Sequence, residues 1–242
     1  RQYLDVATSE EFTQALLVTI KFAMLTVPSG VVLGLGLAVL ADRQLRGMAV
    51  FRTVFSSTIA TSVAVASLMW LFLLQPSRGA LANVGWIQDI FPVVKRPGLL
   101  NDPGTALSAV ALSSVWANLG FTFVVVTAGL QSIPRDLVES AVVDGARAWR
   151  RFVDVTLPLL APTLVFVSVV LVARAFQAYG EIDLLTAGGP QPQASTTTLT
   201  YLVYGRSSLA RNDAGLQSAV AVWLFIVLLV ISVAQLWLLE RR

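Results

Sequence analysis

Apolar residues are gathered into five long stretches, and polar residues, glycines and prolines lie between them. The stretches cover about residues 14–40, 53–74, 105–130, 159–180 and 215–239. A helix needs about 20 mostly apolar residues to cross a bilayer, and each stretch reaches that length. The pattern predicts an all-α, polytopic membrane protein with five spans in a single transmembrane domain over residues 1–242. Pro28 is a candidate kink in the first span.

The composition fits this prediction and excludes several classes of protein. Of the 242 residues, 56% are hydrophobic and 13% are charged, whereas a soluble domain has about 25% charged residues. Cysteine and histidine are absent, so disulfides, thiolate or imidazole metal sites and a histidine base are excluded. No GxxxxGK[ST] stretch provides a P-loop. The net charge of +3 gives no reason to expect a nucleic-acid partner, and we predict no catalytic residue, no metal and no cofactor bound by this chain.

The distribution of lysine and arginine predicts the orientation in the membrane. Cations are dense in residues 41–52, in residues 131–158 and in the C-terminal tail: Arg43, Arg46, Arg52, Arg135, Arg147, Arg150, Arg151, Arg241 and Arg242. The connections on the other side are longer and hold fewer cations: Arg1, Arg78, Lys95, Arg96, Arg206 and Arg211. Because the cation-rich side of a membrane protein faces the cytoplasm, the first set is expected inside, together with the C-terminus.

The segment "SIPRDLVESAVVDGARAWRRFVDVTLP", residues 132–158, predicts two short helices joined by a turn. Ser132 and Pro134 form a suitable helix start, and Gly145 can adopt the left-handed conformation that ends a helix. The second helix has apolar positions at helical spacing: Trp149, Phe152, Val153 and Thr156. We expect Pro158 to end this second helix and to open the next span. The segment is either a basic interfacial helix held by anionic lipid or a docking knob for a cytoplasmic protein.

The spacing E-S-A-x3-G-x9-V-x-L-P in this segment resembles the EAA loop of permease subunits of bacterial ABC importers. Glu139, Ala141, Gly145, Leu157 and Pro158 match that motif, while Ser140 and Val155 are small departures from it. The stretches "LRGMAVFRTVFSSTIATSVAVASLMWLFLLQPSRGALANVG" and "LTAGGPQPQASTTTLTYLVY" also resemble the maltose-type sugar branch of the family. Within that branch the chain is most similar to permeases for sn-glycerol-3-phosphate and glycerophosphodiesters.

The resemblance implies a type I importer fold in the bacterial inner membrane. We call residues 132–158 the elbow. The resemblance implies that seven of its residues couple to an ATPase subunit: Glu139, Ser140, Ala141, Asp144, Gly145, Leu157 and Pro158. The implied partners are a second permease subunit, two ATP-binding subunits that hold ATP and Mg²⁺, an extracytoplasmic solute-binding protein and membrane lipid. Permeases of this family usually have a further N-terminal helix, which residues 1–242 would lack. For Glu139 alone, an ordinary solvated charge near a helix N-terminus is the alternative.

Two cations lie well inside a predicted span, where ionisable residues mark functional sites by default. Lys21 lies in the outer half of its span and has snorkelling to the headgroups as its alternative. Arg174 lies near the outer end of its span and keeps its proton, so it should face a water-filled cavity or pair with a carboxylate such as Glu181. A guanidinium also suits bidentate binding of a phosphate-bearing solute.

Three further residues are candidates for the solute pathway. Gln177 lies one turn after Arg174, and Asn118 lies mid-span in "VWANLGF", where a hydrogen bond between helices is the alternative. Tyr179 is a candidate wall of the pathway, as are other aromatic residues that would otherwise simply pack: Trp116, Phe121 and Phe176.

The predicted outer connection, residues 181–214, is longer than a plain loop requires. Gly188, Gly189 and Pro190 predict a turn, and residues 197–204 predict a short helix. In the resembling family this region lies near the docking surface for the binding protein, so these three residues are docking candidates. A mobile loop without a partner is the alternative.

Functions of other classes fit the sequence less well. A secondary carrier usually has a carboxylate near the midplane of the membrane, and none of the five apolar cores contains one. A membrane enzyme would need clustered acids, histidine or cysteine. We therefore predict a permease subunit of an ATP-driven importer for a glycerophosphate-type or sugar-type solute, with a maltose- or trehalose-type sugar as the alternative.

Overall fold

The computed structural model describes residues 2–42, 47–76, 79, 98–190, 194–205 and 213–240. Within these ranges all regular elements are helical, which confirms the all-α prediction. They are α1 (Gln2–Ala7), α2 (Glu10–Ala41), α3 (Met48–Ser57), η1 (Thr58–Ala60), α4 (Val63–Leu74), α6 (Ala106–Gln131), α7 (Arg135–Val143), α8 (Ala148–Arg151), a π-helical turn (Phe152–Thr156), α9 (Leu157–Phe176), α10 (Gly180–Thr186), α11 (Leu199–Val203) and α12 (Ala214–Glu240). Many cations used above for the orientation lie outside the described residues: Arg1, Arg43, Arg46, Arg78, Lys95, Arg96, Arg206, Arg211, Arg241 and Arg242.

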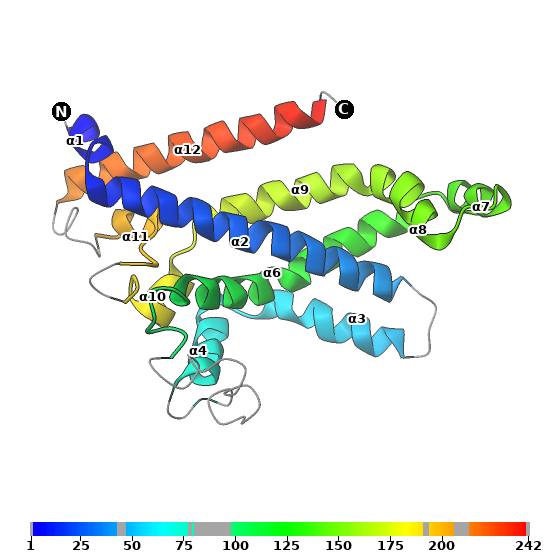
Figure 1. Ribbon diagram of the computed structural model, residues 1–242, viewed down its shortest axis with the longest axis horizontal. Helices are drawn as coiled ribbons and strands as arrows, with labels where there is room; N and C mark the ends of the chain where they lie inside the picture. The colour runs from blue at the N-terminus through cyan, green and yellow to red at the C-terminus, as the bar shows by residue number, and fades with distance from the viewer. Residues whose placement is uncertain are drawn as a thin grey trace.

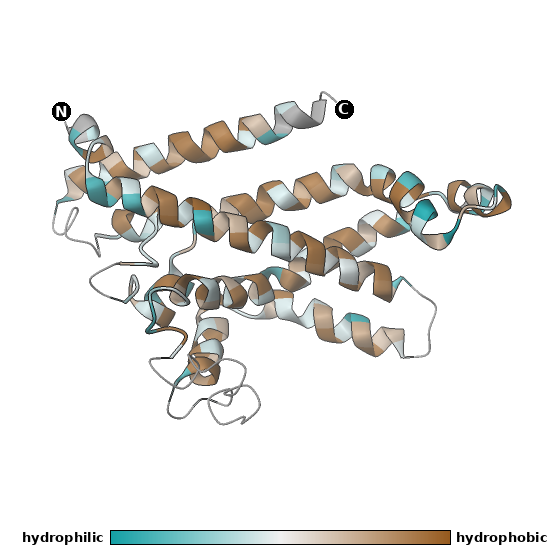
Figure 2. Cartoon of the chain, viewed as in Figure 1, coloured by the Kyte–Doolittle hydropathy of each residue, from teal (hydrophilic) through white to brown (hydrophobic). Residues whose placement is uncertain are grey.

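Four of the described helices are long and apolar enough to cross a membrane. They are α2, α6, the continuous helix Ala148–Phe176 and α12, and they lie roughly lengthwise along the molecule (Figure 1). Pro28 lies inside α2, which continues past it to Ala41. These helices correspond to four of the five predicted spans, and apolar residues predominate along them (Figure 2).

The stretch 53–74, predicted as one span, forms a broken helix in the structure. The axis turns by 107° between the helix formed by α3 with η1 and the helix α4. The break falls in the hydroxyl-rich segment "SSTIATS", where Ser57 and Thr58 donate hydrogen bonds to backbone carbonyls three residues earlier. Ser62 then caps α4 by accepting the N–H of Val65. Such side-chain bonds compete with the helical backbone, which explains the break.

Pro158 does not end the second short helix, contrary to the prediction. The chain stays helical from α8 through the π turn into α9, and the N–H of Leu157 donates to the carbonyl of Phe152, five residues earlier. A proline inside a helix normally removes one backbone bond, and a wider π turn just before it is a local adjustment of the ladder. The span then ends at Phe176, earlier than the predicted residue 180.

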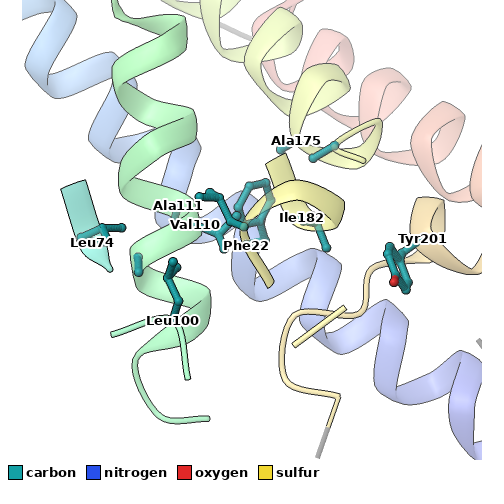
Figure 3. Packing of buried hydrophobic residues seen from close by; sticks show 11 residues of the cluster. Phe22, Leu74, Leu100, Val110, Ala111, Ala175, Ile182 and Tyr201 are labelled. Carbon is teal, nitrogen blue, oxygen red and sulfur yellow. The ribbon is translucent and has the colours of Figure 1, made fainter. Parts of the chain in front are cut away.

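Two apolar clusters hold the bundle together at its two ends. Near the outer connection, Phe22 of α2, Val110 of α6 and Ile182 of α10 are fully buried against one another (Figure 3). At the elbow end, Phe123 of α6 and Leu160 of α9 belong to a second cluster. Together the clusters fix α6 as the central helix, since its apolar window is 61% buried.

The last helix, α12, lies at the periphery of the chain. Only 11% of its apolar window is buried, and Phe225, Val230 and Val233 are more than half exposed. It packs near its start against α1 and α11 through Ala219 and Val220. A face this apolar is suited to lipid or to another membrane helix rather than to water.

Candidate functional site

The elbow between α6 and α9 projects from one end of the molecule, beyond the ends of the long helices (Figure 1). Its first helix, α7, begins after Pro134, whose backbone φ of −58° suits the start of a helix. Asp144 caps the helix at its other end. The first short helix of the predicted pair is therefore present with the predicted start and stop.

Gly145 ends α7 in a left-handed conformation, with φ at +76°. Its N–H donates to the carbonyl of Val142 at 3.0 Å, and the N–H of Ala146 donates to that of Ala141 at 3.0 Å. This pair of bonds is the Schellman arrangement, which satisfies the last carbonyls of the helix. A Cβ built on Gly145 would meet no atom within 4 Å. The space beside the glycine is therefore open to the backbone of another molecule.

The elbow exposes apolar side chains as well as charges. Val143 is 87% exposed and Val142 is 52% exposed, and Glu139, Asp144 and Gly145 are also exposed. Large exposed aliphatic groups beside an open glycine are typical of a surface that a partner covers.

The remaining motif residues surround this tip. Ser140 is exposed and donates to the carbonyl of Leu137 at 3.0 Å, while Ala141 is half-buried. Leu157 and Pro158 lie in the first turn of α9, where Pro158 is exposed and Leu157 is half-buried.

A cavity of about 400 Å³ opens between the elbow and the ends of α2 and α6. Glu139 and Asp42 provide two carboxyl groups to its lining, and Gln131 and Thr156 provide further polar groups. One side of α7 therefore faces a polar recess while its tip faces away from the chain.

A second polar cavity, of about 110 Å³, lies at the break between η1 and α4. Its lining comes from the break and from α6, α9 and α10: Ile59, Thr61, Val63, Ala66, Ser67, Ser113, Ser114, Ala117, Asn118, Phe121, Arg174 and Glu181. Gly120 allows α6 to pack closely against η1, because a Cβ at residue 120 would lie 2.7 Å from the backbone nitrogen of Ile59.

Hydrogen bonds link four polar side chains around this cavity. The guanidinium of Arg174 donates to Asn118 Oδ1 at 2.6 Å, and its Cζ lies 4.6 Å from the centre of the Phe121 ring. Asn118 Nδ2 donates to the carbonyl of Ser114 at 2.8 Å. The hydroxyl of Ser114 donates to Glu181 Oε1 at 3.2 Å. Arg174 therefore faces a polar cavity and binds Asn118, while Glu181, its expected alternative partner, binds Ser114.

The other three pathway candidates lie away from this cavity. Lys21 is exposed on α2, and Gln177 is exposed at the C-terminal cap of α9. The ring of Tyr179 stacks on that of Tyr204, with centroids 4.0 Å apart. Three of the pathway candidates, Asn118, Arg174 and the aromatic Phe121, do line the cavity, whereas Tyr179 has the packing role that was its alternative.

The described part of the outer connection is packed rather than loose. It contains α10 and the expected short helix, α11. Thr197 donates to the carbonyl of Gly188 at 2.8 Å, and Thr19 of α2 accepts the N–H of Leu199 at 2.9 Å. The first bond closes the loop on itself, and the second ties it to α2.

The two glycines proposed for docking are buried, and Pro190 is half-buried. Gly188 has φ at +89°, and a Cβ there would lie 2.7 Å from the Tyr201 ring. At Gly189 the nearest atom would be the backbone nitrogen of Thr196, also at 2.7 Å. The structure therefore gives both glycines a packing role inside the loop, which differs from the contact with a partner that we expected.

Sequence reasoning missed Ser114 and the hydroxyl groups of the α3–α4 break. A signal for Ser114 was present, because Ser114, Asn118 and Thr122 recur every fourth residue in an apolar helix. The cavity can bind a polar solute through one guanidinium, one carboxyl group and several hydroxyls. Within the described ranges, no group of three Asp or Glu side chains is arranged to hold a metal ion.

The family model described as "Binding-protein-dependent transport system inner membrane component" matches residues 12–242. The chain is 35% identical to the sn-glycerol-3-phosphate transport system permease protein UgpA of Agrobacterium fabrum (strain C58 / ATCC 33970), over 98% of this chain and 78% of that protein. It is 34% identical to the UgpA protein of Brucella abortus biovar 1 (strain 9-941), over 99% of this chain and 80% of that one.

Two solved structures share the fold. A bacterial ABC transporter involved in the import of the acidic polysaccharide alginate matches with a TM-score of 0.82 and 23% identity, over 99% of this chain and 82% of that chain. The bacterial alginate ABC transporter in complex with an alginate pentasaccharide-bound periplasmic protein matches with a TM-score of 0.76 and 25% identity, over 96% and 80%.

Proposed function

Because the chain belongs to the family of binding-protein-dependent transport system inner membrane components, we propose that its elbow receives the force that drives import from ATPase subunits on other chains. The chain is a multi-pass inner-membrane permease subunit of an ABC importer, and its role is transport. The finer proposals concern the partners, the coupling residues and the solute.

The observation that carries the coupling proposal is the open, left-handed Gly145 beside two exposed valines. In this proposal Glu139, Asp144 and Gly145 sit in a cleft of the ATPase subunit, with Val143 as the apolar anchor. The elbow is joined to α6 at one end and, through an unbroken helix, to α9 at the other. A displacement of α7 by the ATPase would therefore tilt both helices, which also carry Asn118 and Arg174.

The assembly would contain two different permease subunits, two ATP-binding subunits with ATP and Mg²⁺, and a solute-binding protein on the outer side. The apolar face of α12 fits the second permease or lipid. The elbow and the C-terminus would face the cytoplasm, as the lysine and arginine distribution predicts. A solute-binding partner is supported by the related importer structure that contains a periplasmic protein.

The solute we propose is sn-glycerol-3-phosphate or a glycerophosphodiester. The UgpA relatives carry the name of a glycerol-3-phosphate system, and Arg174 places a guanidinium at a polar cavity in this chain. A guanidinium binds phosphate oxygens through paired hydrogen bonds. Asn118, Ser114 and Glu181 would bind the hydroxyl groups of the solute.

A sugar-type solute is the second candidate, supported by the fold shared with an importer whose bound periplasmic protein holds an alginate pentasaccharide. The related importer structure describes alginate as an acidic polysaccharide. Alginate and glycerol-3-phosphate therefore both combine an anionic group with hydroxyl groups. Binding-protein specificity separates the two candidates better than the permease does.

The proposal is tested by reconstituting the complete importer in proteoliposomes and measuring uptake together with ATP hydrolysis. Glycerol-3-phosphate, glycerophosphodiesters and disaccharides would be supplied with the binding protein. We expect uptake of the phosphate-bearing solutes and stimulation of ATP hydrolysis by the loaded binding protein. Uptake of disaccharides alone would favour the second candidate, and uptake driven by an ion gradient without ATP would contradict the importer mechanism.

A further inference from the structure

The helix that leads from the elbow into the membrane is longer than the apolar core of a bilayer. It has 29 residues, Ala148–Phe176, which correspond to about 43 Å at 1.5 Å per residue, whereas the hydrocarbon core is about 30 Å thick. Residues 155–173 hold no charged side chain and span about 28 Å by the same rise. If these residues fill the hydrocarbon core, as their length and composition suit, residues 148–154 lie at the level of the lipid headgroups.

Cations and an exposed tryptophan are concentrated in that headgroup layer. Arg147, Arg150 and Arg151 lie within five positions of one another, and Trp149 between them is 75% exposed. The side chain of Arg150 is 81% exposed and lies 3.7 Å from Asp154. Exposed ion pairs of this kind contribute little, so the arginine stays available to other anions.

This composition matches the chemistry of an anionic bilayer surface. Tryptophan is enriched at membrane interfaces, where its ring sits among the headgroups. Arginines near the cytoplasmic leaflet are attracted by its negative lipids, and each one favours binding about fivefold. We propose that α8, together with Arg147, binds the headgroups of anionic lipids at the inner leaflet. The choice of leaflet rests on the proposed function, which places the elbow in the cytoplasm.

The two halves of the elbow therefore differ in what they contact. The tip of α7 carries Val143 and acidic residues, and it lies beyond the ends of the long helices (Figure 1). In contrast, α8 is the first turn of the spanning helix itself and carries the basic residues Arg150 and Arg151. Figure 2 shows hydrophilic residues at this end of the helix. Arg52 is an example of a structural arginine, because its guanidinium donates to the carbonyl of Ala41 at 2.8 Å. The arginine side chains of α8 differ from it in being available to anions.

Lipid binding at α8 would hold the pivot of the elbow while α7 moves. A lever transmits force to α9 only if the point at which it enters the membrane stays in place. Contacts between the arginines of α8 and several headgroups would hold this point of entry in place, while α7 stays free to move.

Fluorescence quenching by brominated lipids tests this proposal on the complete importer in nanodiscs. The signal of Trp149 is the difference between wild type and Trp149→Phe. The probes are phosphatidylglycerol or phosphatidylcholine brominated near the headgroup end of the acyl chains, each at the same mole fraction. We expect at least threefold stronger quenching of Trp149 by phosphatidylglycerol than by phosphatidylcholine. The triple variant R147Q/R150Q/R151Q should reduce that preference to near unity, while the control Lys21→Gln should leave it unchanged.

Equal quenching by the two lipids, or none at all, would overturn the proposal. A triple variant that keeps the lipid preference but no longer retains the ATPase subunits would assign α8 to the ATPase instead, and would also overturn it. The result is independent of coupling, because quenching is read without ATP. If Gly145 variants transport normally while Trp149 still prefers phosphatidylglycerol, the proposed coupling fails and the lipid site stands.

Discussion

The elbow and the outer connection are both polar inserts between apolar helices, and both contain left-handed glycines, yet their surroundings are opposite. Gly145, with φ at +76°, has no atom within 4 Å of a built Cβ, whereas Gly188, with φ at +89°, would place its Cβ 2.7 Å from Tyr201. Threonine hydroxyls close the outer connection onto the membrane helices: Thr19 of α2 accepts the N–H of Leu199, and Thr200 donates to the carbonyl of Phe176 in α9. The conformation of a glycine therefore does not reveal its role, but the space around it does: the space beside Gly145 is open to another molecule, and the space beside Gly188 is filled by the described part of the loop.

Replacement of Gly145 by aspartate should have the largest effect. Aspartate is one of the residues that tolerate the left-handed region, so the turn is kept, but the new charged side chain would occupy the open space that we assign to the ATPase. We expect uptake and substrate-stimulated ATP hydrolysis to fall at least about tenfold, while membrane insertion and assembly of the permease pair are kept. The assay is uptake and ATP hydrolysis in proteoliposomes.

Two further variants separate the charge of the new side chain from its bulk and its place in the fold. Asparagine tolerates the left-handed region as aspartate does, so Gly145→Asn keeps the turn and adds bulk without charge. Gly36→Ala is the matched control, because a Cβ there also meets nothing within 4 Å but lies inside α2, and it should transport normally. Full coupling by both Gly145 variants would remove the elbow from the proposed ATPase contact.

Arg174 extends the comparison to the solute pathway, because the closed outer connection is bonded to the end of α9, the helix that carries this arginine. Thr200 donates to the carbonyl of Phe176, and Thr198 donates to that of Ala178. A hydrogen bond to a charged group contributes about 1.5–3 kcal/mol, so Arg174→Ala should lower uptake of glycerol-3-phosphate about 10- to 100-fold. Basal ATP hydrolysis should change little, since the cavity is remote from the elbow.

Arg174→Lys is the conservative variant for this site. It keeps the charge but loses the planar fork that suits a phosphate, so its uptake should lie between those of wild type and Arg174→Ala. Uptake equal to wild type in the alanine variant would exclude Arg174 from the solute pathway.

The features predicted well from sequence are those fixed by local chemistry. Apolar length gives α2, α6 and α12, and the spacing of Pro134 and Gly145 gives the start and stop of α7. The break at Thr61 was missed because the apolar count alone does not register the hydroxyl groups that compete with the backbone.

The polar cavity depends instead on distant pairings. Asn118 and Arg174 are 56 positions apart, and Ser114 and Glu181 are 67 positions apart. No local sequence pattern shows which faces of two distant helices pack together. The sequence could therefore indicate Arg174 and Asn118 as separate candidates, but it could not predict their contact. The burial of Gly188 was missed for the same reason, since Tyr201 reaches it only in the folded loop.

Gly188→Ala should reduce stability more than Gly145→Ala does. Both variants place a Cβ in the left-handed region, but only residue 188 also meets the Tyr201 ring. We expect Gly188→Ala to cost about 2 kcal/mol or more, which lowers the Tm of the purified complex by about 4–8 °C in a chain of this size. Thermal melting in detergent measures it, with Gly145→Ala beside it as the matched left-handed variant. Equal Tm values for the two variants would contradict the conclusion that Gly188 is packed inside its loop while Gly145 is open.

The smallest expected effect is that of Ser114→Ala. Ser114 donates to Glu181 at 3.2 Å, and the loss of one such bond at a half-open cavity should lower uptake about two- to fivefold. Ser113 is the matched control, because it lines the same cavity but donates to the carbonyl of Val110 in its own helix at 3.0 Å. Ser113→Ala should therefore transport like wild type. If the two variants lose uptake equally, the link between α6 and α10 does not position Glu181 for the solute, and Arg174 with Asn118 would be the whole of the polar site.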